Sequence, residues 1–526
     1  MNFSDLIHNV VTDTVQKSLP AFGPELAICA TILALLAWKI LDQEQKLHAF
    51  YLMLVGTGVA LWLAAPWRLS QAELPAPMEI FGGLLVYDTF AIYVRALVLL
   101  FVLLFAVFTR LTAMPGRDAA TDVYVMVLGA TLGMCLMISA NHMLMVFLGI
   151  EMASVPSYAL AGMQRQHRQG SEAALKYAVY GAGTAGVMLY GISLLVGVLG
   201  TAHVPTMAVQ LAELLQQGGG DRHIALMLGG LMVMVGLAFK LSAFPFHFWA
   251  PDVFEGATAE VACFLSIASK AAALALLVRL ALGLGVTADP ALLAALAPAR
   301  HFILGLIALL AAVSCTFGNL AAYGQTNMKR LLAYSTIAHA GYMMMAVAAA
   351  VALAGSNPTG SAHAVASLGF YLGVYLFMNL GAFAFVAFYR DCFGSERIDD
   401  YAGLIRRSPG VALCVTLILL SLIGLPPLAG FTAKFTVFAV LFDARLLLLL
   451  VIGGLNTVLS LFYYLRVVRV MTLQTAAGEA SEPVAPLSIA SWPGLYLLLV
   501  TVPVVLLFVW ANGLLAWAGA AAQRLM

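Results

Sequence analysis

Two stretches of this sequence decide its fold: residues 237–252, LAFKLSAFPFHFWAPD, and residues 421–435, SLIGLPPLAGFTAKF. Each stretch places one lysine and two prolines inside a long apolar run. A proline removes one hydrogen bond from a helix and clashes with the preceding turn, so both runs should be broken helices. Inside a membrane, the carbonyl groups freed by such a break need protein or water partners, which makes both breaks candidate interior sites.

The composition around these stretches is that of a membrane protein. The chain has 526 residues, of which 63% are hydrophobic and 10% are charged, and its mean hydropathy is +0.97. Soluble domains have about 45–50% apolar and about 25% charged residues, so the composition excludes a soluble globular enzyme. The formal net charge of +1 provides no strongly charged face that would indicate a nucleic-acid partner.

Long apolar segments run through the whole chain. A membrane helix needs about 20 mostly apolar residues. About fourteen stretches have that character: 22–41, 47–66, 81–109, 122–140, 142–162, 173–200, 224–246, 254–285, 301–322, 330–354, 363–390, 409–441, 446–470 and 492–520. The sequence therefore predicts an all-α integral membrane protein in which helices 7 and 12 are broken.

The two breaks lie five spans apart, and this spacing predicts an internal repeat. Because five is an odd number, the second copy starts from the opposite side of the membrane, as in many secondary transporters. Four regions are expected: 1–121 with helices 1–3, 122–285 with the first five-helix repeat, 286–470 with the second repeat, and 471–526 with a loop and helix 14.

Basic residues indicate how the chain is oriented. Loops after odd-numbered spans carry thirteen of them: Lys46, Arg110, Arg117, Arg165, Arg168, Lys329, Arg330, Arg390, Arg397, Arg406, Arg407, Arg466 and Arg469. The opposite side carries six: Lys17, Arg68, Arg222, Arg300, Arg445 and Arg524. Positive charge stays on the cytoplasmic side, so both termini are expected in the periplasm if the source is bacterial.

Titratable side chains inside the predicted spans are the candidates for proton transfer: Glu151, Lys240, His247, Lys270, His339 and Lys434. A charge near the bilayer centre, where Glu151 and Lys270 are expected, costs about 2.5–3.5 kcal/mol on insertion scales. A static ion pair that fixes helix packing is the simpler interpretation. Charged groups in four helices, with histidines between them in chain order, favour a proton path instead. Asp88 and Arg95, seven residues apart, are expected to form a structural pair.

Motifs for cofactors are missing from the sequence. It has no C-x-x-C motif, no phosphate-binding G-x-x-x-x-G-K-[ST] loop and no convincing dinucleotide fingerprint. The six cysteines are interpreted as buried small apolar residues. The expectation is that this chain holds no cofactor and no metal.

Several linked motifs resemble those of the antiporter-like subunits of respiratory complex I, most closely the group designated subunit N. They are FLGIEMASVPSYAL, SEAALKY, FKLSAFPFHFWAPDVFEGA, FLSIASKAAAL, NMKRLLAYSTIAHAGYM and GLPPLAGFTAKF. The resemblance covers residues 22–515. It implies that Glu151 pairs with Lys240, that Lys270 is the central lysine, and that Lys434 is the lysine of span twelve. Glu260 departs from the family pattern, which leaves the pairing at the start of span eight open.

The resemblance implies a proton-translocating subunit of an NADH–quinone oxidoreductase. It implies that NADH, FMN, iron–sulfur clusters and quinone belong to partner subunits, and that a sister antiporter-like subunit is among the membrane partners. A subunit of a multi-subunit sodium–proton antiporter is the main alternative. A purely structural membrane subunit and a homologue whose complex takes electrons from ferredoxin also stay open.

Overall fold

The fold is a bundle of long apolar helices. The computed structural model describes residues 8, 11–42, 48–70, 73–112, 114, 116, 119–164, 168–218, 222–287, 289–475 and 487–525. Within these ranges, 13 helices are long and apolar enough to cross a membrane, judged by length and composition. Lys46, Arg117 and Arg165, used above to orient the chain, lie outside the described residues.

The helices follow the predicted order. The first seven long ones are α3 (Gly23–Ile40), α4 (Phe50–Leu63), α5 (Thr89–Leu111), α6 (Ala120–Ser139), α7 (Met143–Ala161), α8 (Arg168–Leu199) and α10 (Arg222–Leu241). The next six are α12 (Ala259–Gly283), α14 (Ala297–Ala322), α15 (Met328–Ala354), α16 (Pro358–Phe393), α20 (Leu447–Leu473) and α21 (Trp492–Val509). The remaining predicted span, 409–441, is divided into α18 (Pro409–Ile423) and α19 (Ala429–Asp443), which accounts for the difference between thirteen and fourteen.

Shorter elements connect the long helices. They are η1 (Thr14–Ser18), α2 (Leu19–Ala21), η3 (Pro66–Ser70), β1 (Met78–Ile80), β2 (Leu85–Tyr87), α9 (Val204–Gln216), α11 (Trp249–Gly256), α13 (Pro290–Ala295), η5 (Ile398–Tyr401), α17 (Leu404–Arg407) and α22 (Ala511–Ala522). The last predicted span, 492–520, bends at Trp510, where α21 gives way to α22.

Both predicted helix breaks are confirmed. The helical chain stops at Leu241 and resumes in α11 at Trp249, with Pro245 between them. It stops again at Ile423 and resumes in α19 at Ala429. The second break turns at Gly424, whose φ of 89° is a left-handed conformation that glycine adopts without strain. The breaks leave carbonyl groups near Leu241 and Ile423 available to side chains from elsewhere.

The predicted start of span three at residue 81 is wrong. Residues 78–87 form an antiparallel hairpin in which Met78 pairs with Tyr87 and Ile80 with Leu85. Its turn contains Gly82 and Gly83, whose positive φ angles of 65° and 84° do not continue a helix. The segment is mostly apolar, which predicts a span, although the adjacent glycines Gly82 and Gly83 indicate a turn.

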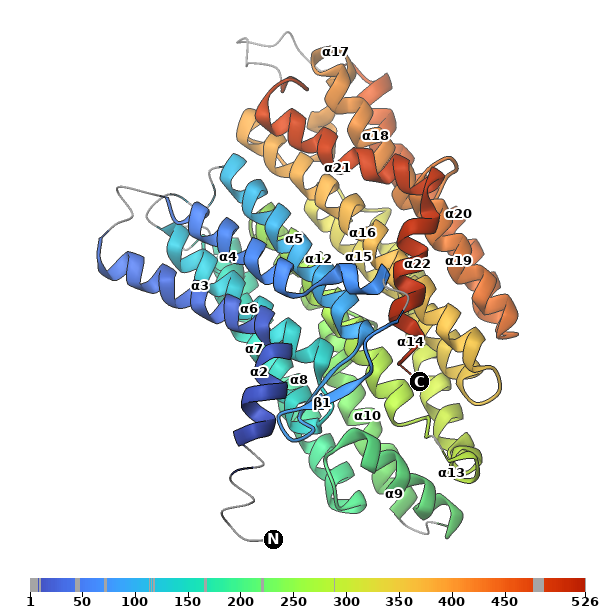
Figure 1. Ribbon diagram of the computed structural model, residues 1–526. Helices are drawn as coiled ribbons and strands as arrows, with labels where there is room; N and C mark the ends of the chain where they lie inside the picture. The colour runs from blue at the N-terminus through green and yellow to red at the C-terminus, as the bar shows by residue number, and fades with distance from the viewer. Residues whose placement is uncertain are drawn as a thin grey trace.

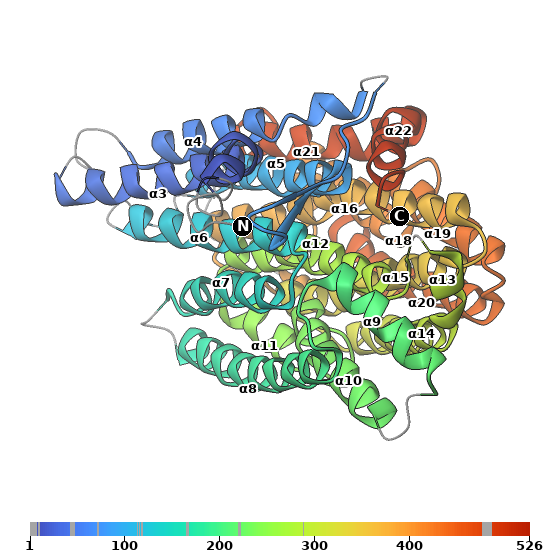
Figure 2. The same ribbon diagram turned by 60° about the horizontal axis from the view of Figure 1, so that its bottom comes forward.

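Three helices form the centre of the bundle. The most apolar stretches of α12, α15 and α16 are 100%, 94% and 94% buried within the chain. In Figure 2 these helices lie in the middle, with α3 and α4 on one side of them and α8 and α10 on another. A charged side chain on the central helices therefore faces protein rather than lipid, and needs polar partners there.

Both ends of the described chain lie at the same end of the bundle. The hairpin contacts the N-terminal segment, because Phe81 N donates to Ser18 Oγ at 2.9 Å. Near the start of α5, Thr89 Oγ1 donates to the carbonyl of Ala521 at 3.0 Å. Figure 1 shows α9 and α13 toward this end and α17 at the opposite one. This agrees with an even number of membrane crossings.

The predicted Asp88–Arg95 pair is wrong, and two other buried pairs form instead. Arg279 donates two hydrogen bonds to Asp88, at 2.9 and 3.0 Å. Arg95 lies 3.0 Å from Glu25, and both side chains are 1% exposed. Asp88 is the extended N-cap of α5, so it does not follow the helical spacing on which the prediction relied.

Replacing Arg279 with methionine is expected to lower the free energy of unfolding by about 3–5 kcal/mol, because it leaves the Asp88 carboxylate buried without its partner. Unfolding of the purified protein in detergent, titrated with dodecyl sulfate, measures the change. Arg397→Met is the matched control, since its side chain is 67% exposed. Equal stability of the two variants would contradict a structural role for the Asp88–Arg279 pair.

Candidate functional site

The three predicted lysines occupy the interior of the bundle. Lys240 lies in the last turn of α10, Lys270 lies in the middle of α12, and Lys434 lies in α19 just after the second break. They are 1%, 1% and 3% exposed. An ammonium group without water needs acceptor atoms in the protein, so the atoms that contact each lysine define the site.

Lys240 is held by a hydroxyl group. Its Nζ donates to Ser154 Oγ at 2.9 Å, and Ser154 lies one turn from Glu151 on α7. No ion pair within 4.0 Å joins Glu151 to Lys240 in the part of the chain described here. Glu151 is only partly buried. The direct Glu151–Lys240 pair that the resemblance implied is therefore absent among these contacts, and Ser154 contacts Lys240 instead. Glu151 lies one turn away on α7, so its charge acts on Lys240 from a distance.

Lys270 and Lys434 use the two helix breaks in the same way. Lys270 Nζ donates to the carbonyl of Leu241 at 3.0 Å, and Lys434 Nζ donates to the carbonyl of Ile423 at 2.8 Å. Each carbonyl ends a helix and lacks the partner that an unbroken helix would supply. Because Leu241 directly follows Lys240, one residue links the first two lysines.

Lys434 has a second partner in an aromatic ring. Its Nζ lies 4.5 Å from the centre of the Tyr342 ring, a contact that favours a cation. No carboxylate pairs with Lys434 or Lys270 among the described residues. The charge on either lysine is therefore balanced only by dipoles and ring electrons.

Polar side chains fill the space between Lys270 and Lys434. His339 Nδ1 lies 2.8 Å from Tyr371 Oη, and its ring lies 5.2 Å from that of Tyr375. One turn before Lys270, Ser266 contacts Thr336 at 3.1 Å. The predicted His339 therefore has a phenol as its direct partner, and such a hydroxyl group can pass a proton by hydrogen-bond exchange.

The sequence interpretation missed the contribution of α16 to this network. Tyr375 Oη lies 3.4 Å from Ser266 Oγ, and Asn379 Nδ2 donates to Ser266 Oγ at 3.2 Å. The signal was present, because Tyr371, Tyr375 and Asn379 follow one another at intervals of four in an otherwise apolar helix.

His247 stands apart from the lysines. Its ring lies 5.3 Å from Phe244 and 4.4 Å from Phe317, and the side chain is 2% exposed. Its Nδ1 is buried without a hydrogen-bond partner. The structure thus places this histidine at the first break without a hydrogen bond to Lys240 or Lys270 among the contacts of the described residues.

The partner of Glu260, which the sequence left open, is Arg390. The Glu260 carboxylate pairs with Arg390 Nη2 at 2.9 Å, and Arg390 also contacts Asp391 at 2.8 Å. Glu260 lies in the first turn of α12, away from the lysines. No three His, Cys, Asp or Glu side chains within the described ranges gather closely enough to hold a metal ion. The groups available for chemistry are ammonium, imidazole, phenol and hydroxyl, all of which transfer protons.

Comparisons with known proteins agree on one family. Residues 140–460 match the family described as NADH:quinone oxidoreductase/Mrp antiporter, TM. NADH-quinone oxidoreductase subunit N of Anaeromyxobacter sp. is 36% identical over 497 residues, which cover 90% of this chain and 91% of that protein. The protein of Symbiobacterium thermophilum named NADH-quinone oxidoreductase subunit N 2 is 36% identical and covers 97% of this chain and 98% of its own.

Solved structures show the same architecture. A chain of respiratory complex I from Thermus thermophilus, solved with bound aureothin, is 29% identical, with a TM-score of 0.71 and coverage of 94% of this chain and 98% of that one. A chain of the Mrp complex from Dietzia sp. has a TM-score of 0.76 at 18% identity, covering 96% and 97%. At that identity the second likeness concerns the fold alone.

Proposed function

The chain belongs to the NADH:quinone oxidoreductase/Mrp antiporter membrane family, and from this premise we propose that it is the proton-translocating membrane subunit N of a bacterial NADH–quinone oxidoreductase. One observation carries the proposal: three buried lysines lie along an interior path, two of them on carbonyls freed by helix breaks, with His339 and its hydroxyl partners between them. A packing role alone does not require lysines at these positions.

In the proposed cycle this chain moves protons and carries no electrons. NADH, FMN, the iron–sulfur clusters and quinone belong to partner subunits, and a sister antiporter-like subunit is among its membrane neighbours. The chain lies in the inner membrane with both termini in the periplasm, as the distribution of basic loop residues favours. Each proton moved against 100 mV requires about 2.3 kcal/mol, which the redox subunits supply.

The path runs from Lys240 to Lys434. Lys240 directly precedes Leu241, and Lys270 donates to the carbonyl of Leu241 at 3.0 Å, so the first two lysines border the same helix break. A change in the charge near Glu151 changes how strongly the protonated form of Lys240 is stabilised, and this starts the transfer of its proton. His339 and Tyr371 relay the proton from the Lys270 region toward Lys434, which releases it at the second break.

The antiporter alternative has weaker support. The relatives named as subunits of NADH-quinone oxidoreductase are 36% identical over almost the whole chain, whereas the Mrp chain shares the fold at 18% identity. The two functions differ in what drives proton movement, which is NADH oxidation in one and a sodium gradient in the other.

Replacing Lys270 with methionine tests the proposal. We expect the complex to assemble and the proton gradient formed per NADH oxidised in inverted membrane vesicles to fall by about tenfold or more, because the central proton carrier is lost. Quenching of an acridine dye reports the gradient, and absorbance reports NADH. Parental pumping by an assembled variant would contradict the proposed path. Sodium-driven proton movement without NADH, lost in the same variant, would instead support the antiporter function.

A further inference from the structure

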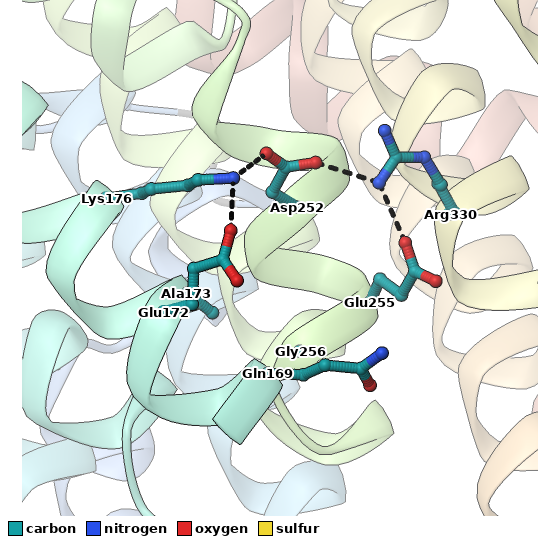
Figure 3. Close-up of a pocket in the computed structure, with 8 residues that line it drawn as sticks. All are labelled: Gln169, Glu172, Ala173, Lys176, Asp252, Glu255, Gly256 and Arg330. Atoms are coloured by element: carbon teal, nitrogen blue, oxygen red, sulfur yellow. Dashed lines mark hydrogen bonds and ion pairs between the residues drawn. The ribbon is translucent and has the colours of Figure 1, made fainter. Parts of the chain in front are cut away.

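The short helix α11 is held in the bundle by five charged side chains that we call the α11 clamp: Glu172, Lys176, Asp252, Glu255 and Arg330. Figure 3 shows Asp252 at its centre, between the lysine and the arginine. Lys176 Nζ lies 2.6 Å from Asp252 and 2.8 Å from Glu172. Arg330 Nη1 lies 2.8 Å from Asp252 and 2.7 Å from Glu255.

The clamp connects parts of the chain that belong to different predicted repeats. Lys176 lies on α8 and Asp252 on α11, both in the first repeat, whereas Arg330 lies in the first turn of α15, in the second. Asp252 is therefore tied to both halves at once. The side chains of Lys176, Asp252 and Arg330 are 34%, 31% and 30% exposed. Ion pairs with such access to water are weak enough to open and close reversibly.

A partly open cavity lies at the clamp. It has a volume of about 170 Å³ and is lined by the five clamp residues together with Gln169, Ala173 and Gly256. At about 30 Å³ per molecule it has room for several waters. The loop preceding α8 and the one preceding α15 both follow odd-numbered spans, so the cavity is expected on the cytoplasmic side.

An aromatic plug separates this cavity from Lys240. Tyr177 lies one turn beyond Ala173 on the same face of α8, and its ring stacks on Trp249 at 4.3 Å and an interplanar angle of 10°. Trp249 Nε1 donates to the carbonyl of Phe239, the residue before Lys240, at 3.0 Å. Trp249 is the first residue of α11. Any movement of α11 therefore moves the plug.

The buried imidazole at the break gives a second reason to expect water here. His247 lies two residues before α11, is 2% exposed, and has an Nδ1 atom without a hydrogen-bond partner. A buried polar atom without a hydrogen-bond partner carries a desolvation cost, which a water molecule at this position would remove. Water that passes the plug would satisfy this nitrogen and approach Lys240.

We propose that the α11 clamp is the gate of the proton-uptake path, with Asp252 as its positioning residue. When Asp252 releases Lys176 or Arg330, α11 shifts, Trp249 moves from Tyr177, and water from the cavity reaches the first break. Because Arg330 belongs to the second repeat, the state of that repeat decides when the gate opens. The assignment to proton uptake rests on the function proposed above, whereas the gate itself does not.

Accessibility to a thiol reagent tests the gate in the assembled complex. Ala243 is fully buried between α10 and α11, and Ala243→Cys places a reporter behind the plug. Inverted vesicles are treated with a membrane-impermeant methanethiosulfonate, and mass spectrometry follows labelling of the peptide that spans position 243. Adding Asp252→Asn is expected to raise the labelling rate about fivefold, the effect of weakening partly exposed ion pairs.

The control variants distinguish opening of a gate from a general destabilisation of the protein. Asp399→Asn, at a side chain 69% exposed, should leave the rate unchanged, and Asp252→Glu, which keeps the charge, should restore slow labelling. If Asp252→Asn fails to assemble, Lys176→Gln and Arg330→Gln each remove one cation and carry the same expectation. Equal labelling rates with and without the clamp change would overturn the gate.

A second measurement tests the assignment to proton uptake. The gradient formed with NADH should decay faster in Asp252→Asn vesicles once NADH is exhausted, because protons leak back through the open gate. Faster labelling with an unchanged decay would keep the gate and overturn its assignment to proton uptake. A complex that pumps no protons in any form would instead refute the proposed function while the labelling result stands.

Discussion

Replacing Lys240 with alanine is expected to reduce proton pumping by about tenfold or more while the complex still assembles. Lys240 contacts Ser154 directly, and the next residue, Leu241, holds Lys270 through its carbonyl. The substitution removes the first proton carrier of the proposed path and creates a pocket that can admit water without passing a proton on. Pumping per NADH oxidised in inverted vesicles measures the effect, with assembly checked on native gels.

A matched lysine provides the control. Lys39 pairs with Asp122 and its side chain is 42% exposed, so Lys39→Ala should pump at the parental rate. Glu151→Gln is expected to reduce pumping less than Lys240→Ala does, because Ser154 rather than Glu151 makes the direct contact with the lysine. Normal pumping by an assembled Lys240→Ala complex would remove Lys240 from the path.

The helix breaks and the lysines beside them were predictable because their signals are local. A proline acts on the hydrogen bond and the turn next to it, so Pro245 and the pair Pro426–Pro427 indicate a break wherever the helix lies. A lysine in an apolar span is equally conspicuous, since its cost does not depend on which helix packs against it. Neither inference requires knowledge of the tertiary structure.

The partners of these groups were not predictable, because they come from distant parts of the chain. Asp88 and Arg279 are 191 residues apart, and no spacing rule connects them. The clamp residue Asp252 has one partner on α8 and another on α15, which only the packing of the two halves decides. Likewise the family resemblance implied Glu151 as the partner of Lys240, whereas the side chain that reaches the ammonium is Ser154, one turn away.

The two helix breaks also share a lysine–carbonyl hydrogen bond that could not be predicted from the sequence. In each case a lysine that follows the break in the chain donates to the carbonyl that ends the preceding helix: Lys270 to Leu241, and Lys434 to Ile423. In the first repeat the lysine lies on a separate helix, α12, and in the second it lies on α19, directly after the break. The boundaries of the repeats, at residues 122, 286 and 471, stay predictions.

Replacing Lys434 with arginine is expected to block turnover, with pumping about tenfold or more below the parental rate. A guanidinium group keeps its proton, and the site suits a cation, since it offers the Ile423 carbonyl at 2.8 Å and the face of Tyr342 at 4.5 Å. The variant should therefore fold and assemble with a permanent charge at the release site. Pumping coupled to NADH oxidation in inverted vesicles measures the block.

Glutamate at the same position provides the comparison. A protonated carboxyl group can donate to the Ile423 carbonyl in place of the ammonium, so Lys434→Glu restores a group that takes up and releases a proton. Its anion would face a carbonyl oxygen and the electron-rich face of Tyr342, so the variant should pump below the parental rate but well above Lys434→Arg. The order parental, glutamate, arginine distinguishes proton release from packing, because arginine preserves the cationic contacts and glutamate does not. If the arginine variant pumps at the parental rate, Lys434 supports the break between α18 and α19 and releases no proton.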